Sequence, residues 1–503
     1  MKRRDFLRTS GFALAGTVLL PQVMCLQSCS QKEGLPIMLN HFNVSENDLR
    51  KVMAVALEKG GDYADLYFQH SFSNSVALQD GAVNRASSNI DYGVGIRVVS
   101  GDQQGYAFVE NITLDEMLKA ARVASRIANG SAKVPPVKID EKVFKNHYPI
   151  LNSWEDQSIQ EKIPYLQTLN EQIFASDPRV VKVNAVINDG TSYILYYNSD
   201  GTICYDVRPM VAMVASCIMQ QGDQIENGSA SRSSRRDASF LTDDLVEDLA
   251  QEVLEKTAIM FDAVKPKGGE MPVVMAAGSS GILLHEAIGH AFEADFNRKN
   301  TSIFSDKLEK QICNKNISVV DDGTIEFDRG SINFDDEGIE VQRTYIVKDG
   351  ILSSYLHDRI SADFYGVEPT GNGRRESFRH MPMPRMRSTY MENGDCTQED
   401  IIASVKNGVF ADNFTNGQVQ IGAGDFTFFV KTGYLIENGK LTQPIKDINI
   451  IGNGPKALAD ITMVANNLKI DQSGGTCGKD GQACPVSMGL PSVLVKQLTV
   501  GGV

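Results

Sequence analysis

The chain has 503 residues, of which 42 % are hydrophobic and 22 % are charged. These proportions are typical of a soluble globular protein and exclude fibrous and disordered architectures, and the length predicts two domains. The formal net charge is -14, from 49 basic and 63 acidic residues. Because nucleic-acid binders carry a basic footprint, this charge argues against nucleic acid as a partner, and also against anionic membrane surfaces.

The first 29 residues predict an export signal. Adjacent arginines at positions 3 and 4 precede an apolar run over residues 12–20, which is too short to span a bilayer as a helix. This layout resembles a twin-arginine signal. Residues 26–29 (LQSC) resemble a bacterial lipoprotein cleavage box, in which Cys29 would carry the lipid. We therefore expect a periplasmic protein, either held at the membrane as a lipoprotein or released by simple cleavage, with an uncleaved anchor as the remaining alternative.

An N-terminal mixed α/β domain is expected over residues 40–264. Capping signals and helical apolar spacing predict helices after Ser45, after Thr113, over residues 158–175 and over residues 243–261. Strand patterns lie between these helices, over residues 93–99, 105–108, 193–197 and 202–207. The last two flank an Asn-Ser-Asp-Gly sequence, which predicts a hairpin.

A β-rich C-terminal domain is expected over residues 265–503. The Pro- and Gly-containing segment 264–269 marks the boundary, and Asp-Gly at 349–350 and Asn-Gly at 438–439 predict tight hairpin turns beyond it. One helix is predicted in this half, over residues 282–296, after an apolar strand. The expected fold class is therefore α+β, with this helix carried by the β-rich domain.

The predicted helix holds the residues with the clearest chemistry. His285 and Glu286 are adjacent, and His290 follows five residues after His285. In the familiar His-Glu-x-x-His zinc helix the histidines are four apart and share a face. Five residues advance a regular helix by about 500°, or about 140° past a full turn, so the imidazoles converge only if the helix is distorted. Gly289 permits a π-type bulge or a break, and we predict one here; the alternative is that both histidines are ordinary polar groups on a surface helix.

Two histidines do not complete a catalytic zinc site, which usually has three protein ligands and one open position. The candidates for the third ligand are nearby carboxylates, other histidines and cysteines: Glu293, Asp295, His357, His380, Cys477 and Cys484. Glycines around Cys477 would let the backbone approach a buried site, and a thiolate binds zinc strongly, but composition does not choose between the two cysteines. Glu286 is predicted to be the general base that takes a proton from zinc-bound water, and not a ligand.

Several segments together resemble the TldD/PmbA metallopeptidase family, on the TldD side. They are residues 62–69, 91–95, 284–290, 293–298, 301–302, 369–377, 383–386, 476–482 and 498–502. The likeness covers nearly all of the chain after about residue 40. It implies Zn²⁺ held by His285, His290 and Cys477, with Glu286 as the general base. It also implies an N-terminal α/β domain, a β-rich C-terminal domain and a dimer that encloses the active sites.

The resemblance implies a zinc peptidase that hydrolyses peptide bonds in unfolded or flexible peptides, as a homodimer or as a heterodimer with a paralogous subunit. The alternative is a non-catalytic peptide-binding or scaffold subunit of a heterodimeric protease, but such subunits lack the metal motif, which is complete here. Two features depart from the family. The familiar members have no export signal, and Cys484 stands where an ordinary residue is expected, so that on oxidation it could pair with Cys477 and disable the site.

Arg374 and Arg375 are a further pair of interest in this sequence. They could contact substrate, but the favoured interpretation is a turn in which both arginines pair with acidic neighbours.

Overall fold

The computed structural model describes residues 34–133 and 137–502. The predicted export signal and Cys29 lie outside these residues. Among the residues described, no helix is long and apolar enough to cross a membrane.

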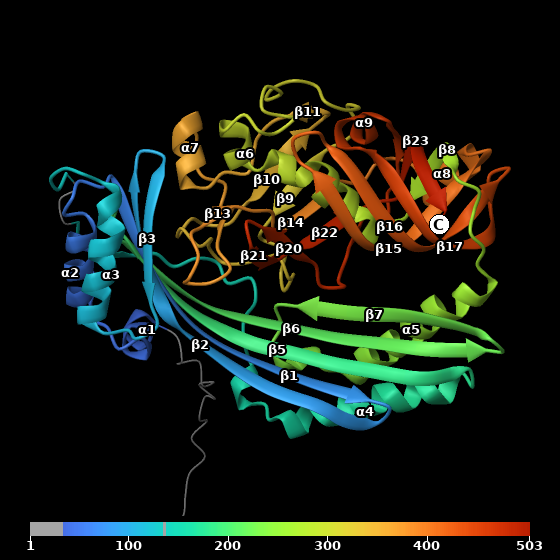
Figure 1. Cartoon of the computed structure of the whole chain (residues 1–503), viewed down its shortest axis with the longest axis horizontal. Coiled ribbons are helices and arrows are strands. Elements are labelled where there is room, and N and C mark those ends of the chain that lie inside the picture. The colour runs from blue at the N-terminus through green and yellow to red at the C-terminus, as the bar shows by residue number, and fades with distance from the viewer. Residues whose placement is uncertain (1–33, 134–136, 503) are drawn as a thin grey trace, which may run out of the picture.

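The N-terminal part is built on one sheet of long, curved strands, which passes beneath the C-terminal part in Figure 1. Its strand order is β3-β2-β1-β5-β6-β4, with β7 also paired to β6. The strands are β1 (Tyr63–Gln79), β2 (Ala82–Ser100), β3 (Gln103–Val109), β4 (Asp140–Glu141), β5 (Val180–Asn198), β6 (Thr202–Gln221) and β7 (Gln224–Ser234). The predicted hairpin is confirmed as β5–β6, but both strands are far longer than expected, because buried and less buried residues continue to alternate along them.

Helices cover this sheet and bury their apolar faces against it. They are α1 (Leu35–His41), α2 (Glu46–Ala56), α3 (Leu114–Ala124), α4 (Ile159–Ser176) and α5 (Asp243–Asp262), with short 3-10 turns at η1 (Ser125–Ile127), η2 (Trp154–Asp156) and η3 (Ala238–Phe240). All four helices predicted for this N-terminal part are present. Ser45 caps α2 in a reciprocal capping box with Asp48, whereas Thr113 caps α3 through its own side chain.

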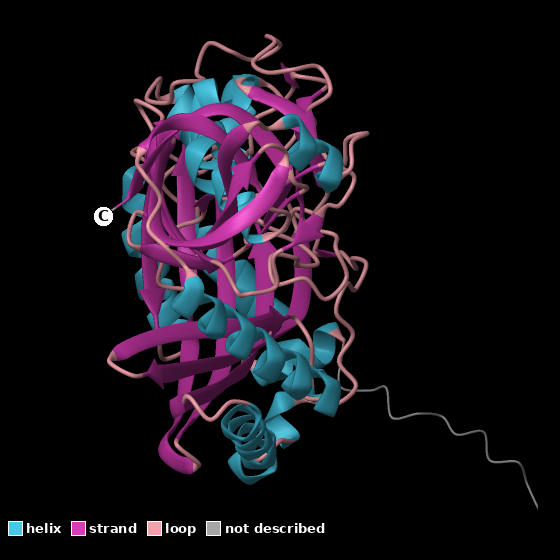
Figure 2. Cartoon of the chain, turned by 90° about the vertical axis from the view of Figure 1, so that its right-hand side faces the viewer, coloured by secondary structure: helices cyan, strands magenta, loops and turns pink. Residues whose placement is uncertain are grey.

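The C-terminal part contains two larger sheets. The first has the order β17-β16-β15-β8-β23-β18, and a further pairing of β17 with β23 closes five of its strands into a barrel, seen as a ring in Figure 2. Its strands are β8 (Gly269–Met275), β15 (Asn407–Gln420), β16 (Asp425–Glu437), β17 (Lys440–Asn453), β18 (Ile461–Val464) and β23 (Val493–Gly502). The second sheet, in the order β11-β10-β9-β14-β22-β19, contains β9 (Val319–Asp322), β10 (Arg343–Lys348), β11 (Ile351–Leu352), β14 (Ser388–Met391), β19 (Lys469–Ile470) and β22 (Ser487–Leu490).

Two small ribbons and several short helices complete this part. The ribbons pair β12 (Gly373–Arg374) with β13 (Met383–Pro384), and β20 (Thr476–Lys479) with β21 (Gln482–Pro485). The helices are η4 (Ser279–Gly281), η5 (Leu283–Gly289), η6 (His290–Phe292), α6 (Ala294–Arg298), α7 (Arg359–Tyr365), α8 (Gln398–Ser404) and α9 (Gly454–Ala459). The turns at 349–350 and 438–439 form as predicted, with positive φ at all four residues. A mixed α/β half followed by a β-rich half confirms the α+β fold class.

None of the sheets in the described structure combines strands from before residue 235 with strands from after residue 268. The domain limits of 40–264 and 265–503 stay a prediction.

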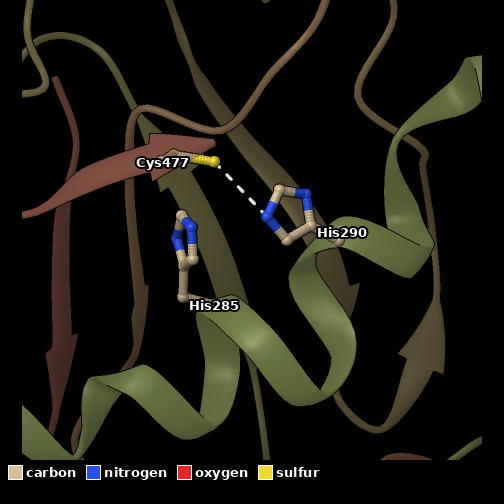
Figure 3. A group of neighbouring side chains, drawn as sticks. All are labelled: His285, His290 and Cys477. Atoms are coloured by element: carbon tan, nitrogen blue, oxygen red, sulfur yellow. Dashed lines mark hydrogen bonds between the residues drawn. The ribbon is translucent and has the colours of Figure 1, made fainter. Parts of the chain in front are cut away.

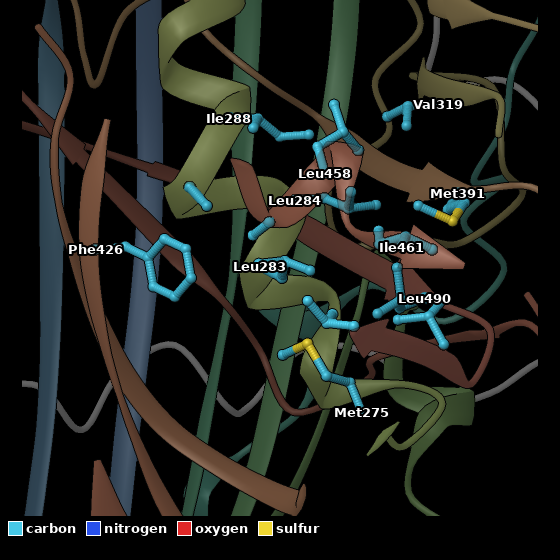
Figure 4. Close-up of a cluster of buried hydrophobic side chains, with 14 of the residues drawn as sticks. Met275, Leu283, Leu284, Ile288, Val319, Met391, Phe426, Leu458, Ile461 and Leu490 are labelled. Atoms are coloured by element: carbon cyan, nitrogen blue, oxygen red, sulfur yellow. The ribbon is translucent and has the colours of Figure 1, made fainter. Parts of the chain in front are cut away.

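The helix η5 lies inside the largest hydrophobic core, which Figure 4 shows in part. Its Leu283, Leu284 and Ile288 side chains are almost fully buried. Around them pack residues of the barrel, such as Phe426, and of the second sheet, such as Met391. Burying a large apolar side chain contributes roughly 1.5–3 kcal/mol, so this packing fixes the position of the helix that carries the histidines.

Buried ion pairs join the two parts of the chain. Arg97 on β2 lies between Asp65 on β1 and Glu337 of the C-terminal part, with N–O distances of 2.5 Å and 2.6 Å. All three side chains have no exposed surface. A buried ion pair is tolerated only while every charge keeps its partner.

Replacing Arg97 with methionine is expected to lower the free energy of unfolding by about 3–5 kcal/mol, because it leaves the buried carboxylate of Glu337 without the cation that pairs with it and removes one of the two cations, Arg97 and Arg375, that pair with Asp65. Urea unfolding measures this change. The matched control is Arg50→Met, which removes an exposed pair with Glu46 at 3.3 Å and is expected to change stability by less than about 1 kcal/mol. Equal effects of the two substitutions would contradict the prediction.

Candidate metal centre

The helix that carries the histidines is distorted as predicted. Residues Leu283–Gly289 form a π-helix, followed directly by a 3-10 turn over His290–Phe292. Because a π-helix bonds each residue to the fifth one along, it brings residues five apart onto one side. The continuous helix expected over residues 282–296 is not formed, since Glu293 has an extended backbone (φ -68°, ψ 127°) and separates η6 from α6.

Gly289 is required by close packing and not by an unusual backbone angle. Its φ is -60°, in the ordinary right-handed helical region. A Cβ at this position would lie 2.3 Å from Met386 Sδ and 2.7 Å from the carbonyl oxygen of Leu284. Both distances are shorter than real Cβ contacts allow, so a side chain here would push the π turn away from its neighbours.

The two histidines converge on Cys477 (Figure 3). The ring centres of His285 and His290 are 5.1 Å apart, with planes at 78°. The Sγ atom of Cys477 lies 3.3 Å from Nε2 of His290. One donor atom from each of the three residues falls within 4.8 Å of the others, and no further His, Cys, Asp or Glu joins this group in the described part of the chain.

This arrangement fits a zinc ion. Tetrahedral zinc with N and S ligands places neighbouring donor atoms about 3.3–3.7 Å apart, and the His290–Cys477 separation already lies in that range. Three buried protein donors leave one position open, as in catalytic zinc sites. Nδ1 of His285 is buried without a hydrogen-bond partner among the described residues, which is costly unless something outside the chain binds that ring.

Electrostatics prepare the cysteine for metal binding. Burial alone would raise the pKa of the Cys477 thiol, but the adjacent His285 and His290 outweigh it and lower the pKa to about 4. Burial would likewise lower the pKa of His290, yet Glu293 and Cys477 raise it well above its usual range. Cys477 is therefore a thiolate at neutral pH, the form in which cysteine binds metals.

Cys477 is held by a hairpin whose two faces differ. In β20 and β21, Cys477, Lys479, Gln482 and Cys484 are buried, whereas the alternate residues are exposed, apart from the partly buried Pro485. Asp480 and Gly481 form the turn with φ of 48° and 73°, as a tight hairpin requires. Cys477 thus projects inward toward the histidines.

Glu286 lies beside His285 on the π-helix and is only partly buried. No hydrogen bond or ion pair to its carboxylate is present within residues 34–133 and 137–502. An unengaged carboxylate next to a metal ligand is free to accept a proton from water or substrate.

The other candidate ligands lie elsewhere or bind other groups. The carboxylate of Glu293 contacts the outer nitrogen of His290, Nδ1, at 3.0 Å, and Asp295 binds Lys479 at 2.8 Å. His357 packs against Tyr355, and His380 contacts the Ser377 hydroxyl. None of these side chains belongs to the metal group.

Cys484 lies directly opposite Cys477 in the hairpin, but its Sγ atom contacts Nη1 of Arg385 at 3.6 Å. Neither of these two cysteines forms a disulfide. Their pairing on oxidation stays a prediction.

Arg374 and Arg375 both contact other groups of the protein itself. Arg375 binds Asp65 at 3.2 Å and lies over the ring of Tyr67, and Arg374 donates to the carbonyl oxygens of Met386 and Pro485. Both side chains are buried. The favoured interpretation therefore holds for Arg375, while Arg374 binds backbone oxygens instead of an acidic residue.

Two cations beside the site were missed in the sequence. Lys479 reaches Glu293 at 3.0 Å, and Arg385 donates to the Cys477 carbonyl oxygen at 2.5 Å. Burial would raise the pKa of Glu293, but Lys479 and then His290 overcome this and lower it to about 2. The available signal was the position of Lys479 two residues after Cys477, which puts both on one face of a strand.

Comparison with known proteins shows the family to which this chain belongs. Family models described as PmbA/TldA metallopeptidase domain 1, central domain and C-terminal domain match residues 64–128, 152–261 and 268–502. A metalloprotease TldD homolog of Haemophilus influenzae is 38 % identical over 472 residues, covering 92 % of this chain and 98 % of that protein. A zinc metalloprotease TldD homolog of Saccharolobus solfataricus is 29 % identical over 460 residues, covering 90 % and 99 %.

A solved structure shares the fold. The crystal structure of TldE from Thermococcus kodakarensis superposes with a TM-score of 0.71 at 17 % identity, covering 90 % of this chain and all of that one. The family models together span most of the chain, and the Haemophilus protein matches it nearly end to end. The chain belongs to the TldD/PmbA family of metallopeptidases.

Proposed function

We propose that the chain is a zinc-dependent peptidase that hydrolyses peptide bonds in unfolded or flexible peptides. The observation that carries this proposal is the convergence of His285, His290 and Cys477 within 4.8 Å, with Glu286 next to the first of them. A thiolate and two imidazoles are a donor set suited to zinc, and three ligands leave a position for chemistry.

Bound at these ligands, zinc would polarise a peptide carbonyl and lower the pKa of water to near 7. Glu286 would accept the proton from the attacking water, aim that water at the carbonyl carbon, and return the proton to the leaving amine. Its partly exposed, unpaired carboxylate suits this role. The surrounding core keeps His285 and His290 fixed and excludes bulk water from their inner side.

The burial of the site supports flexible peptides as the substrate class. His285 and Cys477 each expose only 2 % of their surface. A folded protein could not present a peptide bond to such a recessed group without unfolding locally, whereas an extended segment could. We further propose that the enzyme works as a dimer, with a second copy or a paralogous subunit.

The test is zinc content and cleavage measured on the same purified protein. We expect about one zinc ion per chain and cleavage of an unstructured, internally quenched peptide, but not of a stably folded protein. Removal of zinc by a chelator should abolish cleavage, and added zinc should restore it. A zinc-loaded chain that cleaves no peptide, alone or mixed with its paralogue, would instead support the non-catalytic scaffold.

We also propose that the chain is exported by its twin-arginine-type signal to the periplasm, with Cys29 as the lipidated residue. The sequence of residues 1–29 supports this proposal. Mass spectrometry of the mature N-terminus is expected to find a lipid-modified Cys29. An unmodified N-terminus beyond residue 29 would contradict the lipid anchor but not export.

A further inference from the structure

We infer that Glu293 and Lys479 are positioning residues of the metal site, acting as one unit: Glu293 orients His290, and Lys479 ties the hairpin of Cys477 to the segment of the histidines. This inference rests on the proposed zinc function and adds two residues to it.

The first part of the unit is the contact between Glu293 and His290. The Oε2 atom of Glu293 lies 3.0 Å from Nδ1 of His290, and the carboxylate is fully buried. A carboxylate at Nδ1 keeps a proton on that nitrogen, so Nε2 is the nitrogen that can give up its proton and bind a metal. Nε2 is the atom that faces Cys477, at 3.3 Å. Glu293 therefore selects the ring orientation and tautomer that a metal needs.

The second part is the ammonium group of Lys479. It contacts three acceptors: Glu293 Oε2 at 3.0 Å, Asp295 Oδ1 at 2.8 Å and the carbonyl oxygen of Pro384 at 3.0 Å. The ammonium donates hydrogen bonds to Asp295 and to the Pro384 carbonyl oxygen, and it forms an ion pair with Glu293. The side chain is only 4 % exposed, which is tolerated because its charge is paired with the carboxylates of Glu293 and Asp295.

The unit links the two segments that supply the ligands. Lys479 lies two residues after Cys477 on the buried face of β20, so its ion pair with Glu293 anchors the strand that carries the cysteine. Glu293 lies three residues after His290. The single carboxylate of Glu293 thus touches one ligand directly and reaches the strand of another through Lys479. The three donor atoms are therefore already close together before any metal binds. Because binding does not have to order these side chains, less of the binding free energy is lost and the affinity for the metal is higher.

A purely structural ion pair would have a different signature. It would affect folding stability but not the affinity of the folded protein for zinc. The chain offers a matched control for this distinction in Lys162, whose Nζ lies 2.5 Å from Asp189, with 2 % and 0 % side-chain exposure, inside the N-terminal part. It is as buried as the Lys479 pair but belongs to another sheet.

The experiment compares Lys479→Met, Glu293→Gln, the double variant and the control Lys162→Met. Zinc affinity is measured by competition with a chromogenic chelator, well below the unfolding temperature of each metal-free protein, which is recorded by circular dichroism. We expect zinc binding to weaken by about 10–100-fold in each single variant at the site, and to stay within about twofold in Lys162→Met. Because the two residues act together, the double variant should lose little more than the worse single variant.

Cobalt substitution adds a spectroscopic readout. The thiolate-to-cobalt absorption should persist in Glu293→Gln, which keeps Cys477 and nearly the same side-chain shape, but should require more cobalt to reach saturation. Folded Lys479→Met and Glu293→Gln proteins that bind zinc as tightly as wild type would overturn the inference, even if the wild type is an active peptidase. If the site variants bind zinc more weakly than wild type but the wild type cleaves no peptide, the proposed peptidase function is contradicted and this inference is supported.

Discussion

Replacing Glu286 with glutamine is expected to reduce peptide cleavage by about 10²–10⁴-fold while zinc stays bound, because the amide cannot accept the proton of the attacking water. The substitution keeps the shape of the side chain, and Glu286 is not among the three donors of the metal group. The measurement is kcat on an unstructured peptide, together with zinc content of the same sample.

Glu368→Gln is the matched control for this prediction. Glu368 is an exposed glutamate of the C-terminal part, and the same change of charge there should leave both zinc and kcat unaltered. If Glu286→Gln cleaves as fast as wild type, Glu286 is not the general base. If it loses zinc as well as activity, the carboxylate has a role at the metal that the geometry does not predict.

Replacing Cys477 with serine is expected to weaken zinc binding by more than about 100-fold and to abolish cleavage at ordinary zinc concentrations. Changes outside the ligand shell already reduce metal affinity by roughly 10–100-fold, and this one removes a ligand. A serine hydroxyl does not ionise near neutral pH. The pKa of the Cys477 thiol is about 4, because burial raises it but the neighbouring histidines lower it by more. Equilibrium dialysis against zinc measures the loss.

The cysteine on the opposite strand supplies the control. Cys484 pairs with Cys477 in the register of the hairpin and is equally buried, yet its sulfur contacts Nη1 of Arg385 and is not part of the metal group. Cys484→Ser should therefore keep zinc and activity. If the two thiols join on oxidation, Cys484→Ser should also recover more activity than wild type when zinc is added back after exposure of the metal-free protein to air. A persistently free Cys477 in the metal-free wild type would exclude that pairing.

The sequence alone predicted the distortion of the helix that carries His285 and His290. The five-residue spacing of His285 and His290 does not suit a regular helix, so a distortion had to occur between them, and a π-helix is present there. Local signals also predicted the four N-terminal helices and the tight turns at 349–350 and 438–439, because capping and turn geometry depend on neighbouring residues.

Only the tertiary structure decided which residues meet across the chain. Residues His290 and Cys477 are 187 positions apart, and the choice of Cys477 over Cys484 depends on which strand of one hairpin faces the histidines. Sequence motifs implied that choice through family resemblance, but spacing could not. The roles of Glu293 and Lys479 could not be predicted from the sequence either. A carboxylate near histidines, such as that of Glu293, can bind the metal itself or orient one of the metal ligands. The distances from the Glu293 carboxylate to His290 and Lys479 assign it the role of orienting a ligand. The sequence did not show this, because the partner of a buried charge is set by long-range packing and not by local periodicity.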